Sequence, residues 1–161
     1  MRALPVATLA LLLASPAAQA KDLRRRVAVG VESATGAAPL LSVRAGLPMP
    51  GPAVNVIVEG LGGFATGTGQ ADGGWTAGAR ALYGIVAEDN LNFYGGAGLG
   101  WSQVGGSGAL WVQPSLSVEF FPFGLENLGF SAAWGVQVDL GSSSGVSTWG
   151  AGPGLGVHYW F

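Results

Sequence analysis

The chain of 161 residues contains no cysteine and few charged side chains. Without cysteine, disulfide bonds and thiolate metal sites are excluded. Aspartate, glutamate, lysine and arginine make up 10% of the sequence, against about 25% in a typical soluble domain. Residues 90–118 contain none of these four. In water, so large an uncharged surface would favour association between molecules. A surface that faces lipid, in contrast, has to be uncharged.

Other absences exclude further classes of function. The formal net charge is −2, and no clustered basic surface is present that would suit a nucleic-acid partner. No Gly-x-Gly-x-x-Gly and no Gly-Lys-Ser/Thr sequence occurs, which argues against a nucleotide-binding loop. After residue 20, every long uncharged stretch is interrupted by Gly, Pro, Ser or Gln, so no transmembrane helix is expected. We expect no cofactor.

The first twenty residues are typical of a cleavable signal peptide. Arg2 precedes the apolar run from Leu4 to Ala14, and the small-residue site Ala18-Gln19-Ala20 follows it. The apolar run is well short of the roughly 20 residues that a membrane-spanning helix needs. We therefore expect residues 1–20 to be removed on secretion and residues 21–161 to form one domain.

What the sequence does contain is alternation of apolar side chains with small or polar ones, which has the period of two of a β-strand. Val27, Val29 and Val31 share one face of the first such segment, for example. Turn residues separate the segments, including the proline-rich residues 48–52 and the tight turn Glu88–Asn90. Eight segments follow this pattern, at 26–34, 39–47, 53–64, 75–87, 91–104, 109–121, 128–140 and 148–161.

The last segment ends in an alternating aromatic strand. Leu155, Val157, Tyr159 and Phe161 fall on one face, and Gly154, Gly156, His158 and Trp160 fall on the other. The residues Gly154, Gly156, Tyr159 and Phe161 resemble the C-terminal signal by which outer-membrane β-barrels are recognised for assembly. The sequence Tyr94-Gly-Gly-Ala-Gly-Leu-Gly-Trp101 also resembles the glycine-aromatic strands of small outer-membrane barrels.

As a whole, residues 21–161 resemble the eight-stranded outer-membrane barrels of the outer membrane protein A transmembrane-domain and X type. The resemblance implies an all-β, antiparallel, up-and-down transmembrane barrel with both termini in the periplasm. Residues 48–52, 88–90 and 122–127 would then be periplasmic turns. Residues 35–38, 65–74, 104–108 and 141–147 would face outside. The implied partners are outer-membrane lipid and, during biogenesis, the barrel-assembly machinery.

Charged side chains of the strands fall almost entirely on the face opposite the apolar one. Facing lipid at the bilayer midplane, an arginine would cost about 2–4 kcal/mol, so we expect the charges inside the lumen. If the first and third hairpins are symmetric, Glu32 lies near Arg44 and Glu59 lies opposite Arg80. We therefore predict a lumen charge network of Glu32, Arg44, Glu59, Arg80, Glu119 and Asp139.

Aromatic residues gather at the two ends of the predicted strands. In membrane barrels such residues form girdles at the two lipid–water interfaces. We predict one girdle that contains Trp75, Trp101 and Trp149, and another that contains Tyr83, Phe93, Phe120 and Phe130.

The single histidine, His158, is the residue on which a catalytic or metal site would depend. His158 is predicted to lie inside the lumen near the periplasmic end, with no serine and carboxylate that the sequence places beside it. One histidine without cysteine also offers too few metal ligands. We expect neither an enzyme nor a metal site, although some small outer-membrane barrels modify lipid A with His, Ser and an acidic residue.

The sequence thus predicts an outer-membrane barrel that serves the envelope structurally or as a very narrow pore. One alternative is a secreted, lipocalin-like soluble barrel that binds a small apolar ligand; it would carry its apolar face inside. A second alternative is an outer-membrane enzyme that modifies lipid A.

Overall fold

A computed structural model describes residues 21–33, 39–49, 55–66, 73–141, 145–148 and 154–161. The predicted signal peptide, residues 1–20, lies outside the described residues. Among the described residues, no helix has the length and apolar character needed to cross a membrane. Nine strands are described: β1 (Val27–Ser33), β2 (Leu40–Gly46), β3 (Val56–Ala65), β4 (Gly74–Ala87), β5 (Leu91–Val104), β6 (Ser107–Phe120), β7 (Leu128–Gly141), β8 (Gly145–Thr148) and β9 (Gly154–Trp160).

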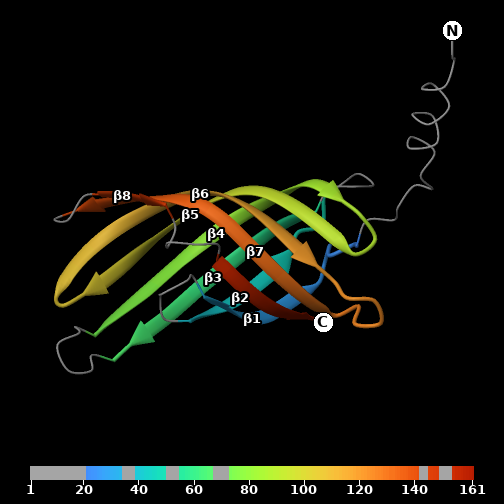
Figure 1. The fold of residues 1–161 in the computed structure, drawn as a ribbon, viewed down its shortest axis with the longest axis horizontal. Helices are drawn as coiled ribbons and strands as arrows, with labels where there is room; N and C mark the ends of the chain where they lie inside the picture. Colours follow the sequence, from blue (N-terminus) through green and yellow to red (C-terminus); the bar gives the residue numbers. More distant parts are fainter. Residues whose placement is uncertain (1–20, 34–38, 50–54, 67–72, 142–144, 149–153) are drawn as a thin grey trace, which may run out of the picture.

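All strand pairs are antiparallel, and the sheet closes on itself (Figure 1). The strand order is β6-β5-β4-β3-β2-β1-β9-β7-β8, and an additional pairing of β6 with β7 completes the ring. Every described strand except β8 has strand partners on both sides, and β8 pairs with β7 alone. Paired edges are what a barrel in hydrocarbon requires. The predicted eight-stranded antiparallel barrel is therefore confirmed, with β8 and β9 sharing one position in the wall.

The last predicted strand differs from the structure in its length. Instead of one strand over residues 148–161, β9 begins at Gly154 and β8 pairs separately with β7. Ala133 is opposite Gly154 in one ladder, while Val136 is opposite Thr148 in the other. Part of the predicted external loop 141–147 is thus strand, because β7 continues to Gly141 and its backbone groups need partners.

The β5–β6 connection is a two-residue turn. Val104 and Ser107 are register partners, and Gly105 and Gly106 between them have positive φ angles of 56° and 84°. Two successive residues of this kind form the tight hairpin turn whose twist suits antiparallel strands, and glycine adopts it without steric cost. The sequence Gly105-Gly106 therefore fixes the register of β5 and β6.

Pro114 interrupts one ladder of β6 without shifting its register. Pro114 lies in β6 without a register shift toward β5, but the β6–β7 ladder has no pair between Val112 and Ser115. The missing proline donor is a sufficient reason for that gap. The register shift lies in β4, between Gly84 and Val86. Pro153 lies outside the described residues.

Side chains alternate between the two faces of the wall as predicted. The apolar members point outward and are exposed, with 52% of Val43 and 61% of Leu99 accessible. Strands β1, β2 and β9 show the same alternation of exposed and buried positions from end to end. The barrel is therefore apolar outside and polar inside, which is the opposite of a soluble barrel with a lipid-binding interior.

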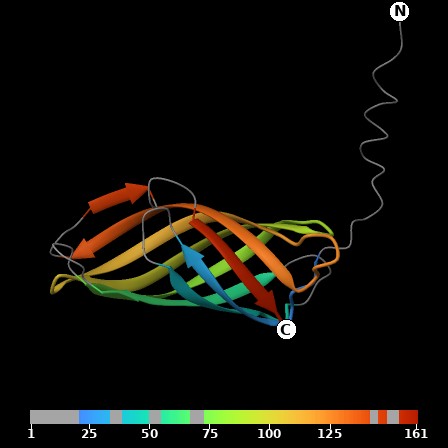
Figure 2. The same ribbon diagram turned by 60° about the horizontal axis from the view of Figure 1, so that its bottom comes forward.

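Both ends of the described chain lie at one end of the barrel (Figure 2). The backbone N–H of Lys21 donates to Glu88 O at the β4–β5 turn, and the N–H of Phe161 donates to Val27 O. Just inside this end is an apolar cluster that closes the lumen. It consists of Leu23, Ala28, Ile57, Leu82, Tyr94, Phe121 and Trp160.

Candidate functional site

A cluster of buried charges fills the lumen next to that apolar cluster. Its arginines and glutamates come from neighbouring strands, with Arg44 opposite Glu59 in the β2–β3 ladder and Glu59 opposite Arg80 in the β3–β4 ladder. All three side chains occupy alternate, inward positions. The register of two adjacent hairpins therefore places one carboxylate between two guanidinium groups.

The guanidinium groups bridge two carboxylates in common. Arg44 Nε donates to Glu59 Oε1 at 2.9 Å, and Arg44 Nη2 donates to Glu32 Oε1 at 2.6 Å. Arg80 Nε donates to Glu59 Oε2 at 2.8 Å, and Arg80 Nη2 donates to Glu32 Oε2. Every oxygen of Glu32 and Glu59 thus accepts from an arginine. Such charge-assisted contacts are stronger than hydrogen bonds between neutral groups.

Glu119 joins the same cluster from β6, on the far side of the lumen. Its Oε1 accepts from Arg44 Nη1 and from Trp160 Nε1, each at 3.1 Å. The Tyr94 hydroxyl lies 3.5 Å from Oε2 of Glu119. The two aromatic donors tie the charge cluster to the apolar cluster below it. Sequence reasoning did not link Trp160 and Tyr94 to Glu119, because the three residues belong to three different strands.

The charge cluster is almost completely removed from water and is not balanced. Glu59 is 0% and Arg44 is 2% exposed. Three carboxylates face two guanidinium groups, so with neutral His158 the formal sum is −1. Taking one partner from a buried ion pair costs about 3–5 kcal/mol, because the other charge is left uncompensated. The cluster therefore holds its member strands in a single register.

His158 lies inside this cluster and has more polar neighbours than the sequence suggested. Its Nε2 is 3.1 Å from Ser42 Oγ, and its Nδ1 is 3.9 Å from Glu119 Oε1. The prediction that no serine and carboxylate lie beside His158 is therefore wrong, because β2 and β9 flank β1 and face each other in the narrow lumen. The Ser42 hydroxyl donates to Glu59 Oε1 at 2.5 Å, so its proton is directed away from His158.

Three residues of the cluster, Glu32, Glu59 and His158, lie close enough together to be considered as metal ligands. The donor set does not fit a cation, because all four carboxylate oxygens already accept from Arg44 or Arg80. A divalent ion would have to displace two guanidinium groups that cannot lose their charge. The geometry is that of an ionic network.

Asp139 does not belong to the buried charge cluster. Its Oδ1 accepts from Gln137 Nε2 at 2.8 Å. In the β6–β7 ladder Asp139 is opposite Trp111, eight residues from Glu119 along β6. At about 3.3 Å per residue, that is about 26 Å along the strand. The prediction that Asp139 belongs to the charge network is therefore wrong. Its position along the barrel axis is too far from the cluster.

Trp111 fills the lumen toward the end opposite the termini. Its ring lies against Gly78 of β4 and Gly100 of β5, where an added Cβ would come within 2.3 Å and 2.2 Å of the indole. The inward glycines thus provide the space for an aromatic side chain that crosses from β6. Trp111 thus adds a third group of buried lumen side chains to the charge cluster and the apolar cluster.

The aromatic residues predicted to form girdles lie at opposite ends of the strands. Trp75 is opposite Phe64, and Trp101 is opposite Leu110, toward the end away from the termini. Toward the other end, Phe120 is opposite Phe130, and both are exposed. Tyr83 is exposed and Phe93 is half-buried near that same end. Trp149 lies outside the described residues.

The C-terminal strand has the two faces that its sequence predicted. Gly154 and Gly156 are buried, whereas Tyr159 and Phe161 point outward. The two outward rings pack edge to face with centroids 5.0 Å apart. Phe161 is 70% exposed, so it adds little to packing within the chain.

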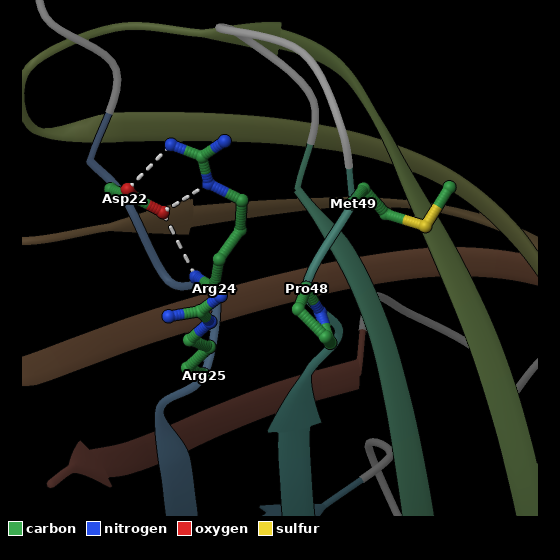
Figure 3. Close-up of a pocket in the computed structure, with 5 residues that line it drawn as sticks. All are labelled: Asp22, Arg24, Arg25, Pro48 and Met49. Atoms are coloured by element: carbon green, nitrogen blue, oxygen red, sulfur yellow. Dashed lines mark hydrogen bonds and ion pairs between the residues drawn. The ribbon is translucent and has the colours of Figure 1, made fainter.

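A pocket of about 530 Å³ lies outside the barrel at the end that carries both termini (Figure 3). Asp22, Arg24, Arg25, Pro48 and Met49 line it. Two hydrogen bonds join the Arg24 guanidinium to the Asp22 carboxylate, at 2.8 and 2.7 Å. Hydrogen bonding to Arg24 holds the pKa of Asp22 below its usual range. Arg25 has a φ of 62°, a conformation that costs a residue other than glycine roughly 1–3 kcal/mol.

Among known proteins, only solved structures show a similarity to this chain. No family model and no curated protein matches the chain. The crystal structure of Neisserial surface protein A aligns with 19% identity and a TM-score of 0.47, over 84% of this chain and 94% of that chain. The Yersinia pestis outer membrane protein Ail in a phospholipid bilayer nanodisc aligns with 14% identity and a TM-score of 0.49, over 84% and 97%.

A crystal structure of Ail, the attachment invasion locus protein of Yersinia pestis, aligns with 15% identity and a TM-score of 0.41, over 84% and 94% of the two chains. The fold itself is defined by the strand pairing described above. An eight-position antiparallel ring, an apolar exterior and a charged interior are together the architecture of the small eight-stranded outer-membrane β-barrels.

Proposed function

We propose that the protein spans the outer membrane as a structural barrel that neither catalyses a reaction nor conducts ions. The observation that carries this proposal is the division of side chains between the two faces of the wall. Val29, Val43 and Leu99 are exposed on the outside, while Arg44 and Arg80 are buried inside. Only hydrocarbon makes such an exterior favourable, because the same surface in water would drive association.

Three layers in the lumen support a closed barrel rather than a pore. Trp160 and its apolar neighbours fill the end near the termini, the arginine–glutamate cluster follows, and Trp111 lies beyond it. A barrel of eight strands has an interior just wide enough for side chains to fill. An ion would have to displace bonded, buried charges in order to pass.

A soluble, lipocalin-like barrel is the less favoured function. It would need an apolar cavity for its ligand and a polar outer surface. In the described residues the interior contains Glu32, Glu59 and Glu119 instead, and the valines of β1 lie on the outside.

A lipid-modifying enzyme has one observation in its favour, the 3.1 Å contact of His158 with Ser42. For nucleophilic attack the serine hydroxyl must donate to the histidine, and a substrate must reach the oxygen. Ser42 donates to Glu59 instead, and both Ser42 and His158 are 0% exposed. We therefore assign these residues to the structural network.

Fractionation of cells that express the full chain tests the proposal. We expect the protein in the outer-membrane fraction, and we expect boiled and unboiled samples to migrate differently on a gel because the closed barrel survives detergent. Recovery in the soluble periplasmic fraction would refute the membrane placement. Hydrolysis of lipid A by purified protein that is lost in Ser42→Ala would refute the absence of catalysis.

A further inference from the structure

The pocket in Figure 3 lies where the N-terminal segment meets the end of β2. On one side a turn runs from Leu23 to Arg26, and on the other side are Pro48 and Met49, which follow the end of β2 after Leu47. Pro48 and Met49 are exposed. The pocket thus combines two arginines and one aspartate, Asp22, with an apolar wall just beyond the end of the strands.

The backbone of the turn is fixed independently of the Arg25 side chain. The Leu23 side chain is fully buried in the apolar cluster, and the Leu23 N–H donates to Asn55 Oδ1 at 3.1 Å. The N–H of Arg25 donates to Gly46 O at 2.8 Å, and the N–H of Arg26 donates to Leu23 O at 3.2 Å. These contacts impose the positive φ at the third residue of the turn, a position that favours glycine. An arginine at this position is unfavourable for folding, which points to a role outside the fold.

Arg25 differs from the other cations at this end of the barrel in its contacts. Within the described residues its guanidinium has no hydrogen bond or ion pair, and the residue is exposed. Its neighbours of like charge have partners: Arg24 with Asp22, Lys21 with Glu126, and Arg26 with Asn127 and two main-chain oxygens. An unpaired positive charge therefore lines a pocket that also has an apolar wall.

We propose that this pocket binds the phosphate of a phospholipid headgroup, with Arg25 as the donor and with Pro48 and Met49 against the glycerol and the first acyl carbons. The inference rests on the proposed placement of the barrel in a membrane. Two outward aromatic residues, Tyr159 of β9 and Phe161 directly after it, lie at the same end of the barrel, and such residues mark the headgroup level. Guanidinium groups bind phosphate through paired hydrogen bonds. A headgroup at this level fits the charge and the apolar wall together.

Lipid retention by the folded, full chain in detergent micelles tests the site. Native mass spectrometry would count bound phosphatidylglycerol, with diacylglycerol as the lipid without phosphate and inorganic phosphate as the free anion. We expect wild type to retain phosphatidylglycerol over diacylglycerol. Arg25→Gly should weaken retention by about tenfold, the effect of one lost charged hydrogen bond. It should also resist unfolding at least as well as wild type, because glycine suits the turn.

Two matched variants distinguish the pocket from general electrostatics. Lys21→Gln removes a charge at the same end but outside the pocket, and it should leave retention within about twofold of wild type. Asp22→Asn frees Arg24 from its carboxylate and should strengthen retention. Equal retention by wild type and Arg25→Gly, or an equal loss in Lys21→Gln, would overturn the site. Binding of inorganic phosphate without selective lipid retention would overturn the lipid as its occupant.

Flotation with phosphatidylglycerol vesicles separates this inference from the proposed function. If wild type does not float, the membrane placement is wrong, and the micelle measurement still decides whether the pocket selects phosphate lipids. If wild type and Arg25→Gly float equally while retention in micelles also stays equal, the barrel is a membrane protein without this site.

Discussion

Arg44 on β2 and Glu119 on β6 are 75 residues apart in the sequence, yet Arg44 Nη1 donates to Glu119 Oε1 at 3.1 Å. The contact crosses the lumen and does not follow any hairpin. Local pairing brings Arg44 to Glu59, but only closure of the ring brings it to Glu119. Arg44 contacts glutamates of three other strands, β1, β3 and β6, so its replacement is an informative single change.

Arg44→Met should destabilise the barrel by about 3–5 kcal/mol, because it leaves three carboxylates facing one remaining arginine. Urea unfolding in lipid vesicles, followed by gel migration, measures the effect. Val43→Ala on the outward face of the same strand is the control, and it should cost much less. A loss below about 1 kcal/mol for Arg44→Met would show that the cluster does not stabilise the fold.

Val43→Arg tests the orientation of the wall. Val43 is 52% exposed, so in water an arginine at this position would be harmless. Facing hydrocarbon, it should cost about 2–4 kcal/mol near the bilayer midplane. Phe64→Arg, at the far end of β3 with 77% of Phe64 exposed, should cost no more than about 1 kcal/mol because the penalty falls near the interface. Equal stabilities of both variants and wild type would contradict the lipid-facing exterior.

Gly78→Ala tests the packing of Trp111. The added Cβ would meet the indole at 2.3 Å, and overpacking of this kind costs about 1–3 kcal/mol. The double variant Gly78→Ala with Trp111→Leu should recover part of that loss, as a double-mutant cycle would show. Gly60→Ala is the matched control, since no atom lies within 4 Å of the added carbon. An equal cost at Gly60 would mean that glycine matters here for backbone reasons alone.

Arg80→Ala tests whether the ionic network seals the lumen. In planar bilayers wild type should give no conductance steps, because three layers of side chains fill the interior. Removing a guanidinium that bonds Glu32 and Glu59 should loosen the middle layer and raise ion leakage. The network would have no sealing role if neither leakage nor urea resistance changed.

Phe161→Ala should separate assembly from stability. Since 70% of the Phe161 side chain is exposed, its loss should change the free energy of unfolding by less than about 1 kcal/mol. If the last strand carries the recognition signal for assembly, the amount of folded barrel in the outer membrane should nevertheless fall severalfold. Refolding of the purified variant in vesicles supplies the stability measurement. An unchanged yield in cells would refute the signal.

Features with a period of two could be predicted from the sequence. The outward valines of β1 and the inward Arg44, Glu59 and Arg80 follow from alternation alone, because each residue's face depends only on its own strand. The Glu59–Arg80 pairing also followed from the symmetry of one hairpin.

Relations between distant strands could not be predicted in this way. The height of Asp139 depends on the stagger of β6 and β7, and the contact of His158 with Ser42 depends on β9 closing onto β1. The division of the last strand into β8 and β9 depends on where β7 finds partners. The buried position of Leu23 could not be predicted either, because Leu23 is the one large apolar residue of a charged segment that has no strand periodicity.

The charge cluster draws its members from six strands, β1, β2, β3, β4, β6 and β9. Until the ring is complete, at least one of its acids or bases has no counter-ion, and hydrocarbon makes an unpaired charge unfavourable. A partly assembled barrel is thus destabilised by unpaired charges in its interior. A strand that slips by one residue turns its charged side chain toward the hydrocarbon. Insertion should therefore proceed as an all-or-none event, with the ionic centre rejecting every arrangement but the native one.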